Sequence, residues 1–295
     1  MKPPPFSYHD PRTIADVVGL LGRLDNAKLL AGGQSLMPML NMRFVLPDHV
    51  IDLNRVEGLS YIRERDGALD IGAMTRQREL EYSDIVARRC PLMHEAIRLV
   101  GHRQTRNRGT LGGSLCHLDP SAELVAVAAA HDATVTVNGP NGTREIAFAA
   151  FPVAFMAPAI EPNELVTAVR FALWPSGHGH GFVEFARRHG DFAIVSAAAL
   201  LTENAAGEIS RASITLGGVG VAPIRANEVE QALIGPVPDD KRLRDICELC
   251  RKFDAIEDIH ASSSYRQHLA TVMARRALEQ ARARLPSRTA AARAH

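Results

Sequence analysis

The chain has 295 residues, of which 46% are hydrophobic and 23% are charged, so it can bury a sizeable core and does not belong to the disordered class. Its 34 Lys and Arg residues nearly balance its 33 Asp and Glu residues, which argues against a protein that mainly binds nucleic acid. At roughly 150 residues per domain, the length favours two domains.

The N-terminal third is predicted to alternate helices and strands. Apolar side chains recur at helical spacing over residues 13–25, and short apolar runs predict strands at Leu29–Ala31, His49–Leu53 and Ala68–Ala73. Helical spacing returns over residues 75–100. This alternation is typical of the α+β and α/β classes.

Residues 101–123 are predicted to form a long polar loop that is rich in glycine. Such a loop inside a compact chain is usually either functional or disordered. It carries Arg103, Arg106 and Arg108. Two interpretations of these cations remain open, namely a solvated basic surface, or a site that attracts an anion or the acidic surface of a partner.

A helix at Ala122–Ala130 and then a hairpin are predicted to follow this loop. Alternating side chains and turn residues place the hairpin strands at Thr134–Val137 and Arg144–Phe148. A further strand is predicted at Leu165–Leu173. Residues 175–181, with the sequence PSGHGHG, are typical of a linker with solvated histidines and form the best candidate for a domain boundary.

The C-terminal part is predicted to hold three strands between Gly181 and Val219 and helices after Pro223. Cys247 and Cys250 lie on one predicted helix, which favours core thiols over a metal site. Residues 286–295 are rich in Ala and Arg without apolar periodicity, so a disordered tail is expected.

The number of cysteines and the hydropathy of the chain indicate the cellular compartment of the protein. Four cysteines, of which the other two are Cys90 and Cys116, are too few for a disulfide scaffold in a chain of this length. The first twenty residues contain no apolar core of signal-peptide length, and no apolar run approaches the ~20 residues of a spanning helix. We therefore expect a cytoplasmic protein without a membrane span.

Two glycine segments carry the strongest functional signal, and they read Ala31-Gly32-Gly33-Gln34-Ser35 and Thr110-Leu111-Gly112-Gly113-Ser114. Paired glycines let a backbone approach a ligand closely, and successive N–H groups can converge on an anion. Two such loops would hold the two phosphates of a dinucleotide. Neither segment fits the common Gly-x-Gly-x-x-Gly or P-loop fingerprints, and tight structural turns remain an open alternative.

In their surroundings, KLLAGGQSLMPMLNMR and VGHRQTRNRGTLGGSLCHLDPSAEL, the two segments resemble the flavin-binding segments of the FAD-carrying medium subunit of molybdenum hydroxylases. This is the family of the carbon monoxide dehydrogenase medium subunit and the xanthine dehydrogenase FAD domain. The resemblance extends from about Phe6 to Leu285 and includes Asp191-Phe192-Ala193.

The resemblance implies an α+β fold. A two-lobed FAD-binding domain of the vanillyl-alcohol oxidase class is expected over residues 1–177, with lobes of about 1–58 and 59–177. A smaller C-terminal α+β domain, a three-stranded sheet with helices, is expected over residues 178–285.

The resemblance also implies FAD-binding positions. Both glycine segments match pyrophosphate loops, Lys28 supplies a cation before the first, and Glu123 matches an acidic position that binds polar groups of FAD. Val100 stands where xanthine dehydrogenases carry an aromatic side chain, and Arg187 or Arg188 replaces a lysine near the flavin. The predicted set is Lys28, Ala31, Gly32, Gly33, Gln34, Ser35, Val100, Thr110, Leu111, Gly112, Gly113, Ser114, Glu123, Arg187 and Arg188.

By resemblance, the chain is the electron-transfer subunit of a heterotrimeric molybdenum hydroxylase. Electrons would pass from a molybdenum–pterin centre in a large subunit, through two two-iron two-sulfur clusters in a small subunit, to FAD and then to an external acceptor. A dimer of heterotrimers is implied. FAD carries the redox chemistry, so no catalytic side chain and no metal are expected in this chain.

Two other functions remain open from the sequence. One is a non-catalytic assembly or scaffold subunit that has lost its flavin, and the other is a stand-alone FAD oxidoreductase. Intact glycines and Glu123 argue against the first. The second would need an acid–base constellation facing a substrate, and the sequence shows none.

Overall fold

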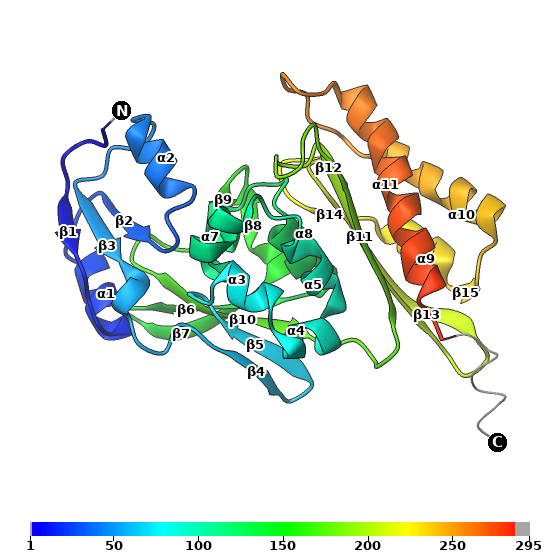
Figure 1. The fold of residues 1–295 in the computed structure, drawn as a ribbon, viewed down its shortest axis with the longest axis horizontal. Coiled ribbons are helices and arrows are strands. Elements are labelled where there is room, and N and C mark those ends of the chain that lie inside the picture. Colours follow the sequence, from blue (N-terminus) through cyan, green and yellow to red (C-terminus); the bar gives the residue numbers. More distant parts are fainter. Residues whose placement is uncertain (1, 287–295) are drawn as a thin grey trace. The chain divides into compact units, whose positions relative to one another are not determined.

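The computed structural model describes residues 2–286, and its backbone contacts divide the chain into two compact units (Figure 1). Unit 1 takes the chain up to Ser83 together with His102–Leu118 and Asp132–Ala172. Unit 2 takes Asp84–Gly101, Asp119–His131 and the chain from Leu173 on. Each unit is therefore assembled from three separate stretches of sequence.

Unit 1 contains two main sheets. A parallel sheet has the order β1 (Ser7–His9), β3 (His49–Asp52) and β2 (Ala27–Leu30). An antiparallel sheet has the order β4 (Ile62–Arg65), β5 (Ala68–Gly72), β10 (Leu165–Ala172), β6 (Thr134–Gly139) and β7 (Gly142–Ala147). Two short strands, β8 (Pro152–Ala154) and β9 (Ala157–Pro158), pair with each other. The strands predicted in this region and the hairpin are thereby confirmed.

The helices of unit 1 are short. They are α1 (Ile14–Leu21), α2 (Leu36–Asn41), α3 (Gln77–Glu81), α6 (Arg103–Arg108) and α7 (Leu111–His117), with 3-10 turns η1 (Leu53–Arg55) and η2 (Phe148–Ala150). The Thr13 hydroxyl caps α1 by accepting from the Asp16 amide. Val17 of this helix and Ile51 of β3 are fully buried in one core cluster.

The polar loop predicted over residues 101–123 is wrong, because this stretch forms α6 and α7 and begins α8. Helix α6 has no apolar side chain and buries the paired guanidinium of Arg106, which apolar periodicity cannot reveal. Helix α7 buries Leu111 and Leu115, and its two glycines lie within it.

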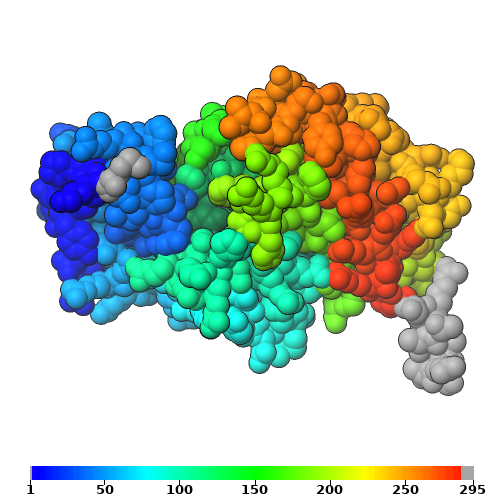
Figure 2. All heavy atoms as spheres, turned by 45° about the horizontal axis from the view of Figure 1, so that its top comes forward, coloured from blue at the N-terminus to red at the C-terminus, as the bar shows by residue number. Residues whose placement is uncertain are grey.

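Unit 2 contains a sheet with the order β11 (Gly179–Phe185), β12 (Val195–Glu203), β13 (Glu208–Gly217) and β14 (Ile224–Arg225), and β15 (Gly235–Pro236) also pairs with β13. The three predicted strands are present, and the two short strands extend the sheet to five. The helices are α4 (Asp84–Arg89), α5 (Pro91–Ile97), α8 (Glu123–Ala130), α9 (Asn227–Leu233), α10 (Asp240–Cys247), the 3-10 turn η3 (Glu248–Lys252) and α11 (Ser263–Ala283). Figure 2 shows α11, in orange to red, at the surface of unit 2.

Of the linker predicted at residues 175–181, residues 175–178 form a turn and Gly179–Gly181 form the start of β11. The glycines of β11 let α11 pack closely against this strand. A Cβ on Gly179 would lie 2.1 Å from the Ala281 carbonyl oxygen, and one on Gly181 would lie 2.4 Å from the Ala277 carbonyl oxygen. His178 is buried, and its Nδ1 lies 2.8 Å from the Pro175 carbonyl oxygen. The expectation of solvated histidines is therefore wrong for His178, whose pKa is lowered by burial.

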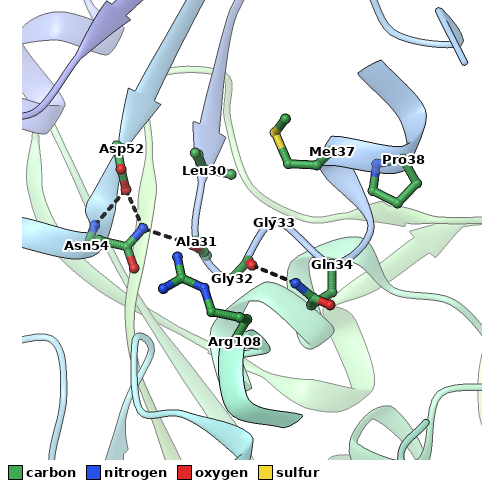
Figure 3. A pocket seen from close by; sticks show the side chains of 10 residues that line it. All are labelled: Leu30, Ala31, Gly32, Gly33, Gln34, Met37, Pro38, Asp52, Asn54 and Arg108. Carbon is green, nitrogen blue, oxygen red and sulfur yellow. Dashed lines mark hydrogen bonds between the residues drawn. The ribbon is translucent and has the colours of Figure 1, made fainter. Parts of the chain in front are cut away.

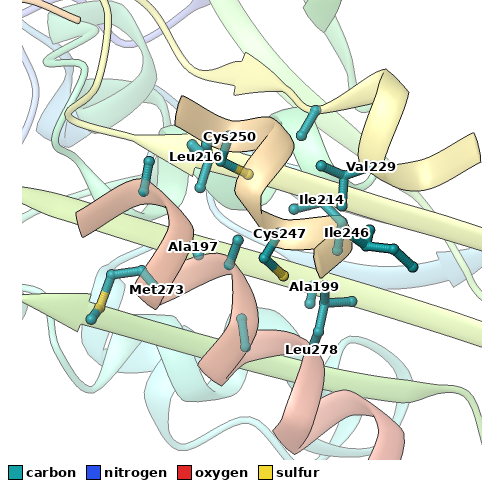
Figure 4. Close-up of a cluster of buried hydrophobic side chains, with 14 of the residues drawn as sticks. Ala197, Ala199, Ile214, Leu216, Val229, Ile246, Cys247, Cys250, Met273 and Leu278 are labelled. Carbon is teal, nitrogen blue, oxygen red and sulfur yellow. The ribbon is translucent and has the colours of Figure 1, made fainter. Parts of the chain in front are cut away.

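The core of unit 2 lies between α10, α11 and the sheet (Figure 4). Cys247 and Cys250 are 1% and 0% exposed among apolar side chains such as Met273 and Leu278, so the prediction of core thiols is confirmed. No helix among residues 2–286 is both long and apolar enough to cross a membrane. Of the tail predicted over residues 286–295, all but Pro286 lies outside the described residues.

Candidate functional site

The first glycine segment turns the chain from the end of β2 into α2. Gly33 has a φ of +72°, which a residue with a Cβ adopts only under strain. Gly32 lies directly against the end of α6, because a Cβ there would be 2.3 Å from the Arg108 carbonyl oxygen. Both glycines are therefore required by the backbone path.

The amides of this turn have no acceptor in the described part of the chain. The N–H groups of Gly32, Gly33, Gln34 and Ser35 form no hydrogen bond, although the Gly33 carbonyl accepts from the Met37 amide. Backbone donors that lack partners in such a turn are suited to an anionic ligand.

A pocket of about 370 Å³ opens beside these amides (Figure 3). It is lined by Leu30, Ala31, Gly32, Gly33, Gln34, Met37, Pro38, Asp52, Asn54 and Arg108. The Arg108 side chain is exposed and borders the pocket beside Gly32. The Asp52 carboxylate is already engaged, because it accepts from the Tyr8 hydroxyl at 2.6 Å and from the Asn54 amide at 2.9 Å.

The second glycine segment lies beside the first. It supplies the N-cap and the first turn of α7, where the Thr110 hydroxyl accepts from the Gly113 amide at 3.1 Å. A Cβ on Gly113 would lie 3.4 Å from the Cβ of Ala31, and one on Gly112 would lie 2.6 Å from the Cβ of Ala73. The structure thus brings the two predicted segments together, although 75 or more residues separate them in the sequence.

Most amides of the second segment already have acceptors within unit 1, and the role of this segment toward FAD stays a prediction. Those of Leu111 and Gly112 donate to the carbonyl oxygens of Thr75 and Ala73 at 3.1 and 2.8 Å, and that of Ser114 donates to the Thr110 carbonyl oxygen. These amides therefore have acceptors within unit 1, and the glycines allow α7 to pack closely there. The N–H groups that lack acceptors beside the pocket belong to the first segment.

The remaining predicted positions divide between the units. Lys28 is exposed on β2 and is not part of the pocket lining. Val100, Glu123, Arg187 and Arg188 all belong to unit 2. Among these, Glu123 is 4% exposed at the start of α8, and Arg187 lies 3.1 Å from the ring Nδ1 of His260. Their role toward FAD stays a prediction.

Asp52, Asn54 and Arg108 line the pocket but are absent from the predicted set. Arg108 is one of the three cations for which an anion site remains open from the sequence, and a sequence signal for Asp52 and Asn54 exists as well. Asp52 ends β3 and Asn54 follows it, and β3 is the parallel neighbour of β2, with Asp52 opposite Leu30. Ligands bind at the carboxyl ends of neighbouring parallel strands, so polar residues after β3 could have been included.

The pocket fits the diphosphate part of FAD. Its first segment offers unpaired N–H donors, Arg108 offers a cation, and the one nearby carboxylate is held by neighbouring donors. Backbone N–H groups and guanidinium groups both donate hydrogen bonds to phosphate oxygens.

Comparison with known proteins shows the family. Residues 4–174 match the FAD binding domain in molybdopterin dehydrogenase, and residues 180–281 match the CO dehydrogenase flavoprotein C-terminal domain. The chain is 40% identical over 287 residues to the 6-hydroxypseudooxynicotine dehydrogenase complex subunit alpha of Paenarthrobacter nicotinovorans, covering 95% of this chain and 96% of that protein. It is 37% identical to the carbon monoxide dehydrogenase medium chain of Afipia carboxidovorans, covering 96% of this chain and 99% of that protein.

Solved structures agree. A chain of carbon monoxide dehydrogenase from Hydrogenophaga pseudoflava superimposes with a TM-score of 0.93 at 36% identity, covering 97% of this chain and 100% of that chain. Quinoline 2-oxidoreductase from Pseudomonas putida 86 gives 0.92 at 33% identity, covering 96% and 99%. The protein therefore belongs to the family of FAD-binding medium subunits of molybdenum hydroxylases, as a flavoprotein component of an oxidoreductase.

Proposed function

We propose that this subunit binds the FAD diphosphate at the first glycine segment and passes electrons through FAD to an external acceptor. The electrons would come from a molybdenum centre and iron–sulfur clusters in a large and a small partner subunit, in the cytoplasm. The observation that carries the diphosphate site is that Gly32, Gly33 and Gln34, whose amides have no acceptor among the described residues, line the same pocket as Arg108.

The names of the relatives support a multi-subunit setting. They are a medium chain, a medium subunit and a complex subunit, and this chain matches them over nearly their whole length. The cysteines agree with clusters held elsewhere, because two two-iron two-sulfur clusters with four thiolate ligands each would need eight cysteines, and the chain has four.

The role of the chain toward FAD is binding and orientation. FAD supplies the electron-accepting and electron-donating chemistry when bound. The amides of the first segment and the Arg108 guanidinium would neutralise and position its phosphates, and Gly33 would keep the backbone close enough for that contact.

Replacement of Gly33 by Val tests the site. A Cβ at Gly33 would lie 3.2 Å from side-chain carbons of Leu30 and Met37, and the positive φ would be strained. We expect the purified chain to lose its flavin absorbance. The matched control is Gly58→Val, which carries the same strain at φ +77° in a turn with nothing within 4 Å. Flavin retention by Gly33→Val, or equal loss in both variants, would refute the site.

The electron-transfer role needs the assembled complex. We would purify it through a tag on this chain, identify the co-purifying subunits, and measure molybdenum, iron and FAD. In a Gly33→Val complex, substrate should still bleach the iron–sulfur absorbance while reduction of the acceptor stops. A chain that purifies alone with FAD and oxidises a substrate would support a stand-alone oxidoreductase instead, and a colourless chain that assembles normally would support a scaffold.

A further inference from the structure

The Asn54 side chain connects the first glycine segment to the rest of the pocket. Its Nδ2 donates to the Ala31 carbonyl oxygen at 3.2 Å and to Asp52 Oδ1, and its Oδ1 accepts from Nη2 of Arg76. Figure 3 shows Asn54 between Asp52 and Ala31 at the edge of the pocket. One amide thus joins the ends of two parallel strands to an arginine from the loop before α3.

Arg76 connects the same network to the end of α6. Its Nη1 donates to the Arg108 carbonyl oxygen, and its backbone forms an isolated antiparallel bridge with Thr110. The next residue, Gln77, donates its amide to the Gly109 carbonyl oxygen at 2.8 Å. The guanidinium is half-buried, and burial together with the nearby charge of Arg108 lowers the pKa of Arg76.

We infer that Asn54 and Arg76 form a clamp that fixes the first glycine segment and the end of α6 in the geometry that receives the FAD diphosphate. The inference rests on the proposed site. Both are positioning residues, because they hold Ala31 and Arg108 through carbonyl oxygens and leave the free amides and the Arg108 side chain to the ligand.

The physical gain is pre-organisation. Ordering one backbone residue costs about 1–2 kcal/mol, and glycine has the most freedom to lose. A turn with two adjacent glycines and unbonded amides would lose this conformational entropy each time FAD binds, unless side chains already hold the turn in its bound conformation. The planar fork of arginine suits this task, since it reaches two acceptors on different segments at once.

The test uses full-length Asn54→Ala, Arg76→Ala and Arg76→Lys in apo form, with Arg55→Ala as matched control. Arg55 is the neighbour of Asn54, but it pairs with Asp10 at the surface. We expect each clamp variant to weaken FAD binding roughly tenfold or more by fluorescence titration, and the double alanine variant to be little worse than either single one, because the two residues act as a unit. Arg76→Lys should fail to restore affinity, since it keeps the charge but loses the fork.

Backbone hydrogen exchange of the apo chain supplies a readout that a general loss of stability would not reproduce. Exchange of the hydrogen-bonded amides of Met37, which donates to Gly33, and Gly109, at the end of α6, should accelerate in the clamp variants, while that of β5 and β10 stays at the wild-type rate. Unchanged FAD affinity, additive losses, or faster exchange throughout unit 1 would overturn the clamp. If Asn54→Ala or Arg76→Ala fails to fold, Asn54→Ser and Arg76→Lys decide by the same two readouts.

The two proposals fail in distinguishable ways. If Gly33→Val keeps its flavin, the diphosphate site itself is wrong. If Gly33→Val loses its flavin but the Asn54 and Arg76 variants bind FAD with wild-type affinity, the site stands and only the clamp falls.

Discussion

Arg106 and Arg108 lie two residues apart on α6, yet their guanidinium groups have opposite surroundings. Arg106 is buried and pairs with Glu81, with its Nε 2.9 Å and its Nη2 3.1 Å from the two carboxylate oxygens. Arg108 is exposed and borders the pocket. The first arginine anchors the helix, and the second is available to a ligand.

Replacement of Arg108 by Gln should therefore weaken FAD binding. A hydrogen bond to a charged group contributes about 1.5–3 kcal/mol, so we expect a loss of roughly tenfold to a hundredfold. The salt dependence of binding should also decrease. FAD titration of the apo chain at low and high ionic strength measures both effects. Arg103→Gln, an exposed arginine of the same helix outside the pocket lining, is the control, and an equal loss in both variants would contradict this role.

Glu184 on β11 gives unit 2 a pH-dependent stability. Its Oε2 is buried and has no hydrogen-bond partner among residues 2–286, and burial raises the pKa of the carboxyl from 4.5 to about 7. Between these pH values the unfolded chain has released the proton and the folded chain retains it. The folded state then binds more protons, so stability falls as pH rises through this window.

Glu184→Gln removes this titration. As pH rises from roughly 5 to 8, we expect the urea midpoint of the wild-type chain to fall relative to that of the variant. At the upper end of this range the variant should have the higher urea midpoint. Urea unfolding at several pH values measures the difference. Parallel pH trends in the two proteins would show that Glu184 does not carry the effect.

At the scale of elements, α7 packs through a glycine against Ala73, the residue that follows β5. A Cβ on Gly112 would lie 2.6 Å from the Cβ of Ala73 and 2.8 Å from its carbonyl oxygen, which is itself bonded to the Gly112 amide. Gly112→Ala should therefore destabilise the chain by roughly 1–3 kcal/mol through overpacking. Gly19→Ala in α1 is the matched control, because nothing lies within 4 Å there and alanine should stabilise that helix by about 0.5–1 kcal/mol. Urea unfolding should give opposite signs for the two variants.

Elements with apolar alternation could be predicted from the sequence, and elements held by polar contacts could not. The hairpin β6–β7 and strands β12 and β13 follow alternation and turn residues. Helix α6 was missed because its buried side chain is Arg106. The glycines of β11 favour a linker when only the sequence is considered, since glycine marks a turn and a close packing contact equally well.

The candidate site divides in the same way. The two glycine segments could be found because their composition is unusual over a few consecutive residues. The contacts of Asn54 and Arg76 could not be predicted, because they join residues that lie 22 to 32 positions apart. Local composition does not record such pairings. The parallel register of β2 and β3 brings Asn54 near Ala31, and the bridge with Thr110 places Arg76.

At the scale of the whole molecule, the chain passes back and forth between its units. Unit 2 begins with α4 and α5, resumes with α8, and is completed by the chain after Leu173. The two family models end at residue 174 and start at residue 180, on either side of the boundary predicted at residue 177. By backbone contacts, unit 2 also includes Asp84–Gly101 and Asp119–His131, so a cut at residue 177 would divide this unit.

Helix α8 shows what such a cut would expose. Seven of its eight residues are buried. Its end is fixed from the sheet of unit 2, because Ser213 Oγ donates to the Ala130 carbonyl oxygen at 2.8 Å and Arg225 Nη1 donates to that of Ala129 at 2.9 Å. Both donors come after residue 177, so a fragment of residues 1–177 keeps the helix but loses the surface that buries it.

We therefore expect the fragment 1–177 to aggregate or to bind the dye ANS, because an apolar helix face without its partner is exposed to water. Size-exclusion chromatography, ANS fluorescence and urea unfolding of the fragment, each beside the full chain, measure this. A monomeric fragment with a cooperative unfolding transition and no ANS binding would contradict this expectation. It would show that α5 and α8 fold without the sheet that residues after 177 supply. Two-part expression, with residues 178–295 supplied as a second chain, should restore a soluble complex if the packing of α8 on β12 and β13 is what the cut removes.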